Sequence, residues 1–145
     1  MRLRRVRTPR VRNALAVSLA ETGGGALLIL GAATPLAAAL LNGSMFTAIR
    51  KVHLEKGVWN TSGGYEYNLV LIATVTAIVD DPGRPSVDDA LGIRDSGTGW
   101  ALAAVAAGAA GSALAVELGK RAELEPEPGR RFVREPEEVP AGATA

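Results

Sequence analysis

Residues 47–88 read TAIRKVHLEKGVWNTSGGYEYNLVLIATVTAIVDDPGRPSVD, and this stretch predicts much of the fold. An apolar segment over residues 65–79 lies between two polar regions. The first contains a Gly-Gly pair and the chain's only histidine, His53. The second opens with the turn signal Asp-Asp-Pro-Gly at residues 80–83. The pattern predicts a helix that joins two polar loops.

The composition indicates one domain of closely packed helices. The chain has 145 residues, its aromatic content is 4 %, and its apolar residues are mostly Ala, Leu, Val and Gly. The absence of cysteine excludes disulfides, thiolate chemistry, iron–sulfur clusters and Cys-ligated zinc. A single histidine also excludes a bis-His haem or a multi-His metal site within one chain, so we expect no metal site and no covalently bound cofactor.

Four apolar segments predict helices over residues 14–33, 36–53, 63–79 and 98–118. Thr34 is the predicted N-cap of the second helix, with Pro35 at its first position. Ser86, followed three residues later by Asp89, predicts the cap of a short surface helix. The first apolar run is longer than that of a usual signal peptide and lacks a cleavage site, so we expect it to be retained.

A soluble, alanine-rich bundle is the alternative to a membrane protein, because two of the segments are shorter than a bilayer span. A soluble bundle needs a polar stripe on each helix, and residues 69–79 and 101–116 offer almost none. We therefore predict an all-α, four-helix transmembrane bundle over residues 14–118. A basic cytoplasmic segment over residues 1–13 precedes it, and a disordered polar tail over residues 119–145 follows it.

The distribution of charge predicts the topology. With four spans, fourteen lysines and arginines lie on one side of the membrane and only Arg84 and Arg94 on the other. Both termini are then cytoplasmic, in a plasma membrane. The arginines of residues 2–12 adjoin a span and fit topology determination better than nucleic-acid binding, so we expect no nucleic acid as a partner.

Small residues four apart predict close contact between helices, in the sets Ala39, Gly43, Thr47 and Ala104, Gly108, Ser112. The same spacing also arises by chance in alanine-rich helices, so both interpretations stay open. The run Gly23-Gly24-Gly25 lacks the Lys-Ser/Thr of a phosphate loop and predicts a packing groove.

Six side chains are expected to gather at one mouth of the bundle: Glu21, Arg50, His53, Trp59, Tyr65 and Glu66. An intramembrane carboxylate such as Glu21 indicates a functional site or a structural ion pair, here with Arg50. Trp59 and Tyr65 suit a stacking role or an ordinary interfacial aromatic belt. His53 suits a proton relay or a cap on carbonyl groups.

Three motifs resemble the DoxX/DoxD family of small bacterial and archaeal membrane proteins. They are Ala-Ile-Arg-Lys-Val-His at residues 48–53, Gly-Gly-Tyr-Glu-Tyr-Asn-Leu at 63–69, and Asp-Pro-Gly with Ser-Val-Asp at 81–88. The resemblance covers roughly residues 14–92. It implies a four-helix integral membrane protein, and some members are subunits of a thiosulfate:quinone oxidoreductase.

The chain departs from the family at its start. Family members usually have a membrane helix before the one that carries Glu21, whereas here an arginine-rich stretch stands in that place. Either the chain is inverted in the membrane or its true start lies upstream. We expect that the true start lies upstream, in which case the present chain lacks the first helix of the family's bundle.

The leading functional hypothesis is a membrane redox accessory that binds a quinone at the mouth. Glu21, Arg50, His53 and Glu66 would hydrogen-bond or protonate the quinone, and Tyr65 and Trp59 would stack on it. The chain has no residue that stores electrons, so a donor subunit or soluble substrate is needed, and whether the chain is itself an enzyme stays open. The alternatives are a non-catalytic membrane scaffold or interaction subunit and, ranked third, a transport role. The expected partners are the lipid bilayer and either a redox partner subunit or a second copy of the chain in a homo-oligomer.

Overall fold

The computed structural model describes residues 8–124, with side chains described over residues 14–121. Every regular element of this part is helical, which confirms the predicted all-α class for the described residues. The α-helices are α1 (Thr8–Leu30), α2 (Thr34–Ala48), α3 (Glu66–Asp80), α4 (Val87–Ala90) and α5 (Thr98–Leu124). Between α2 and α3 lie the π-helix η1 (Ile49–His53) and the 3₁₀ turns η2 (Leu54–Lys56) and η3 (Asn60–Ser62).

The helix ends differ from the predicted ones in several places. Helix α1 begins at Thr8 and α5 continues to Leu124, so residues 119–124 are helical and not part of a disordered tail. The α-helical part of α2 ends at Ala48, and its predicted continuation to residue 53 takes the form of η1. The rest of the predicted basic segment and tail, residues 1–7 and 125–145, lies outside the described residues.

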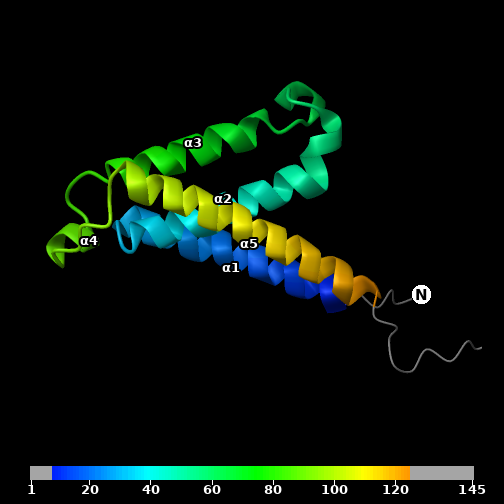
Figure 1. Ribbon diagram of the computed structural model, residues 1–145, viewed down its shortest axis with the longest axis horizontal. Coiled ribbons are helices and arrows are strands. Elements are labelled where there is room, and N and C mark those ends of the chain that lie inside the picture. The colour runs from blue at the N-terminus through cyan, green and yellow to red at the C-terminus, as the bar shows by residue number, and fades with distance from the viewer. Residues whose placement is uncertain (1–7, 125–145) are drawn as a thin grey trace, which may run out of the picture.

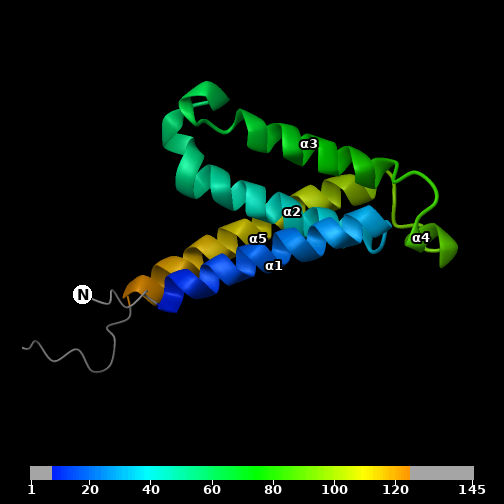
Figure 2. The same cartoon turned by 180° about the vertical axis from the view of Figure 1, so that it is seen from behind.

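Helices α2 and α5 form the centre of the molecule (Figure 1). Helix α2 makes its most extensive contact with α5 and also packs against α1 and α3. In both views α1 runs along one edge and α3 along the other, with α2 and α5 between them (Figure 2). The loop between α2 and α3 therefore lies at the same end as the start of α1 and the end of α5, and α4 lies at the opposite end.

The central contact depends on glycine. A Cβ atom built on Gly108 would lie 2.9 Å from the Ala39 carbonyl oxygen and 2.9 Å from the Gly43 nitrogen. One turn further along, the hydroxyl oxygens of Thr47 and Ser112 are 2.9 Å apart. The two predicted sets of small residues thus face each other across the α2–α5 interface, and the prediction of close helix contact is confirmed. In the glycine run Gly24 also packs, against Ala37 and Leu41, as predicted for a packing groove.

Large apolar side chains point outward and small ones fill the interior. The buried apolar cluster consists of Ala38, Val79, Ala101 and Ala104, whereas Leu19 is 72 % and Ile29 is 88 % exposed. Within the described residues, one helix is long and apolar enough to cross a membrane, over Thr98–Arg121, and only 22 % of its apolar window is buried. Ala14–Leu30 is apolar but shorter. A four-span bundle is therefore not established, while the exposed apolar exterior argues against α5 as the core helix of a soluble protein.

A carboxylate that is distant in the sequence, that of Asp88, caps α2. Asp88 Oδ1 accepts from the Ala33 backbone N–H at 2.8 Å, and Asp88 Oδ2 accepts from the Thr34 backbone N–H and the Thr34 hydroxyl, both at 3.0 Å. The Asp88 N–H donates in return to the Gly31 carbonyl at 2.9 Å. The predicted N-cap role of Thr34 is wrong, because Thr34 is already helical and Ala33, at φ 47°, stands before it. The cap is supplied in space by Asp88 and not locally.

Asp88 is held in its ionised form by this arrangement. Partial burial acts to raise its pKa, but hydrogen bonds from the Thr34 and Ala33 N–H groups and from the Thr34 hydroxyl act to lower it. The net pKa lies below the ordinary value of 3.8. In the unfolded chain, Asp88 takes up a proton at a higher pH than in the folded chain. The stability that ionised Asp88 contributes to the fold is therefore fully present above the ordinary pKa, and it is lost as the pH falls through the lowered pKa of the folded state.

Replacing Gly108 with alanine should destabilise the protein by about 1–3 kcal/mol, because the new methyl group meets backbone atoms of α2 that cannot move freely. Thermal unfolding of the purified protein, followed by circular dichroism, measures the loss. Gly111→Ala is the matched control, because no atom lies within 4 Å of its added Cβ. Equal midpoints for the two variants would contradict the close α2–α5 contact.

Replacing Asp88 with asparagine should cost about 1–3 kcal/mol near neutral pH, because at least one donor of the α1–α2 turn loses its acceptor. The unmodified protein should lose stability below about pH 4, and the variant should lack that component of the pH dependence. Thermal unfolding over a series of pH values tests both points. Asp89→Asn is the control, since Asp89 makes an exposed ion pair and should matter little. Identical acid profiles for the unmodified protein and Asp88→Asn would rule out this role.

Candidate functional site

The six residues predicted for the mouth divide into two groups. Arg50 and His53 lie on η1, Trp59 lies in the following loop, and Tyr65 and Glu66 stand at the start of α3. These five share the end of the α2–α3 hairpin. Glu21 instead lies on α1, which packs against α2 and α5, while α3 packs against α2 and α5 from the other edge.

Backbone contacts give the loop of residues 57–66 a compact shape. The Tyr65 N–H donates to the Gly57 carbonyl at 3.2 Å, and the Glu66 N–H donates to the Val58 carbonyl at 2.8 Å. A Cβ atom on Gly64 would collide with the backbone of Gly57 and Val58, so only glycine allows this approach. The Gly-Gly pair of the sequence motif therefore has a structural role that brings Trp59 and Tyr65 onto one loop.

Two predicted site residues hold the loop through their side chains. His53 Nδ1 lies 2.6 Å from the carbonyl oxygen of Gly63. A carbonyl oxygen only accepts, so Nδ1 carries a proton in this contact, and Nε2 is the nitrogen that faces away from Gly63. Glu66 Oε2 accepts from the Asn60 backbone N–H at 3.2 Å. One of the two roles predicted for His53 was to cap carbonyl groups. His53 does contact a carbonyl group, but that group belongs to Gly63 in the loop and not to the helix that carries His53.

The predicted ion pair between Glu21 and Arg50 is not formed. The ion pairs among side chains 14–121 join Arg84 to Asp89 and Glu117 to Lys120 and Arg121. Glu21 and Arg50 are both exposed. The spacing along a helix predicts an approximate depth for Glu21 but does not determine which face of the helix its carboxylate occupies.

A groove of about 320 Å³ lies between α1, α2 and α5. Its lining is almost wholly apolar, and three hydroxyl-bearing residues contribute to it, namely Ser44, Thr47 and Ser112. Ala20, the residue before Glu21, belongs to the same lining. The groove exists because α2 and α5 meet through small residues and α1 contacts α5 only lightly.

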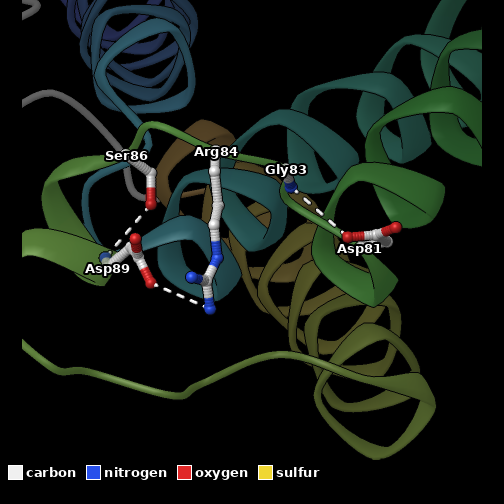
Figure 3. A network of polar contacts seen from close by, with 5 residues as sticks. All are labelled: Asp81, Gly83, Arg84, Ser86 and Asp89. Atoms are coloured by element: carbon white, nitrogen blue, oxygen red, sulfur yellow. Dashed lines mark hydrogen bonds and ion pairs between the residues drawn. The ribbon is translucent and has the colours of Figure 1, made fainter.

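A polar hollow of about 410 Å³ lies at the opposite end, around α4. Figure 3 shows hydrogen bonds and an ion pair among residues of this end. Arg84 Nη2 lies 3.4 Å from Asp89 Oδ1, the Asp89 N–H donates to Ser86 Oγ at 3.1 Å, and the Gly83 N–H donates to Asp81 Oδ1 at 3.4 Å. The predicted cap of a short helix by Ser86 is confirmed. No group of side chains suited to holding a metal ion occurs in the described part of the chain.

Sequence reasoning missed three residues that make polar contacts between helices or cap one: Asp88, Asn42 and Asn68. Asp88 lies in the Ser-Val-Asp motif, but no spacing along the sequence links its carboxylate to the α1–α2 turn. Asn42 and Asn68 are buried amides inside apolar helices, and that placement alone marks them. Asn42 Nδ2 reaches Thr76 Oγ1 at 3.4 Å, while Asn42 Oδ1 has no partner among the described residues.

Comparison with known proteins gives a match over the first part of the chain. The family model DoxX matches residues 7–54, about a third of the chain. No curated protein and no solved structure gives a significant match. The matched residues include α1, the α1–α2 turn, α2 and η1, and thus three of the predicted site residues: Glu21, Arg50 and His53. This segment is similar to the DoxX family, which confirms the predicted resemblance over residues 7–54. Of the three motifs, the match includes the one at residues 48–53.

Proposed function

We propose that the chain is a multi-pass protein of the prokaryotic plasma membrane, with both termini in the cytoplasm, that binds a quinone as an accessory of a membrane redox system. The membrane part rests on the DoxX match, on the α5 candidate span and on an exterior of large apolar side chains. Buried amides and hydroxyls in the interior, such as Asn42 and Ser112, fit a bundle whose helices associate through polar contacts and small residues.

The two ends of the molecule differ in charge, which supports the proposed orientation. Residues 50–56 carry three cations and one carboxylate, while residues 80–95 carry five aspartates and two arginines. The first set shares its end with the start of α1 and the end of α5, and the second surrounds α4. Basic segments favour the cytoplasmic side.

The quinone part rests chiefly on the hydrogen bond between His53 and Gly63. Because this bond uses Nδ1, His53 has Nε2 to accept from or exchange a proton with a ligand at the loop. Glu66, Tyr65 and Trp59 share the same compact loop, and Arg50 lies one turn before His53. A bound quinone would supply the redox chemistry. The apolar groove between α1, α2 and α5 offers a surface for its hydrocarbon tail, with Glu21 next to a lining residue.

The topology can be tested with single cysteines, because the chain has none of its own. Ser62→Cys lies in the basic loop and Ser96→Cys in the acidic one, and both positions are exposed. A membrane-impermeant maleimide should label Cys at position 96 in intact cells and Cys at position 62 only after permeabilisation. Labelling of both sites in intact cells would contradict a multi-pass chain, and the reverse pattern would indicate an inverted one.

Quinone binding can be followed through Trp59 in a Trp100→Phe background. Titration of the detergent-purified protein with a short-chain quinone should give saturable quenching. Glu66→Gln should weaken binding roughly fivefold or more, as expected when a hydrogen bond to a charged group is lost. The glutamine side chain in this variant still has an oxygen that can accept from the Asn60 backbone N–H, so the loop should keep its structure.

Glu55→Gln is the matched control, since Glu55 is an exposed glutamate on η2 whose side chain is in none of the ion pairs above. It should leave quinone binding unchanged. Linear quenching that neither substitution alters would exclude quinone binding at this loop. The scaffold hypothesis, in which the same polar end docks another protein, would then be the better account.

A further inference from the structure

We infer that the segment from Arg50 to Trp59 is a surface that binds anionic lipid headgroups. This inference rests on the proposed membrane placement but not on quinone binding. The segment, which we call the hook, consists of most of η1, all of η2 and the three residues that follow. It lies at a corner of the molecule in both views, and η1 makes its main contacts with α2 and η2 (Figures 1 and 2).

The hook combines exposed cations with exposed apolar side chains, and its cations outnumber its single carboxylate, Glu55. Its cations are Arg50, Lys51 and Lys56, all exposed. By contrast, residues 14–49 contain one charged side chain, Glu21, and residues 67–79 and 98–116 contain none. Among the side chains described, none of the ion pairs involves a hook cation. These charges are therefore available to an external anion.

Large apolar side chains of the hook are exposed beside these cations. Trp59 is 68 %, Leu54 is 57 % and Val52 is 52 % exposed. Tryptophan, aliphatic residues and lysine or arginine on one short element are typical of segments that lie at the level of lipid headgroups. Apolar groups enter the edge of the hydrocarbon, while the cations reach the phosphates.

The geometry of the hook suits a surface position. The wider turn of η1 and the tight turn of η2 interrupt the α-helical pattern at the end of α2, and Gly57, at φ 80°, then redirects the chain toward the loop. The hook therefore follows α2 at the basic end of the molecule and does not extend the axis of α2. An acidic protein would satisfy the cations but not the exposed aliphatic side chains, so the combination favours an anionic lipid surface.

The test uses Trp59 as a local reporter, in a Trp100→Phe background, after reconstitution into bilayers. Brominated phosphatidylglycerol and brominated phosphatidylcholine are compared at equal mole fractions, without quinone. Brominated phosphatidylglycerol should associate near Trp59 several-fold more strongly, since each interfacial cation contributes about fivefold. High salt should reduce this preference.

The triple substitution Arg50→Gln, Lys51→Gln, Lys56→Gln should bring the preference to about one. The control Arg84→Gln, Arg94→Gln removes the two arginines of the opposite end and should keep the preference. Comparable circular dichroism of all forms ensures that the variants are folded.

Equal quenching by the two lipids in the unmodified chain would overturn the inference and leave the membrane placement intact. No quenching by either lipid would also overturn it, and shielding of Trp59 by added poly-glutamate would then assign the hook to an acidic protein. Failure of the membrane placement itself is recognised separately, by release of the chain from membranes in alkaline carbonate.

Discussion

The approach of α2 to α5 at Gly43 and Gly108 is the constraint on which the rest of the fold depends. The absence of side chains at these two positions lets the helix backbones touch, and α2 thereby becomes the centre of the molecule. Helices α1 and α3 then occupy the two remaining edges. With small residues inside, the large apolar side chains have no interior to fill and face outward, which is the arrangement a bilayer favours and water does not.

The two ends of this bundle are built by different physical means. At the α4 end, Asp88 ties the α1–α2 turn to a distant segment, and Gly31 leaves no room for a Cβ atom beside Ser86. At the other end, the loop after η1 is held by backbone hydrogen bonds and by His53, while the hook cations and Trp59 are exposed. At the first end Asp88 is engaged in contacts within the protein, whereas at the second the hook cations are exposed. The ligand and lipid interactions that we propose are therefore placed at the second end.

The sequence predicted the candidate site in part. Arg50, His53, Trp59, Tyr65 and Glu66 are close in the chain, and a tight loop keeps them at one end of the hairpin. Glu21 lies on a separate helix, α1, and spacing along a helix does not specify which face the carboxylate occupies. Thr34 likewise had the residue type of an N-cap, yet the stronger carboxylate acceptor came from Asp88. A carboxylate accepts stronger hydrogen bonds than a hydroxyl group does, and in the folded protein Asp88 lies close enough to take the capping role that the residue type of Thr34 suggested.

By itself the sequence determined the all-α class, the approximate helices, the small-residue contact, the Ser86 cap and the resemblance to DoxX. These follow from composition, from spacing along one helix and from motifs, all of which are local. The tertiary structure alone decided that α2 is central, that Asp88 caps it, that Glu21 and Arg50 do not pair, and that His53 binds Gly63. Such contacts join residues on different segments, and they depend on how helices pack against one another, which no pattern within a single segment specifies.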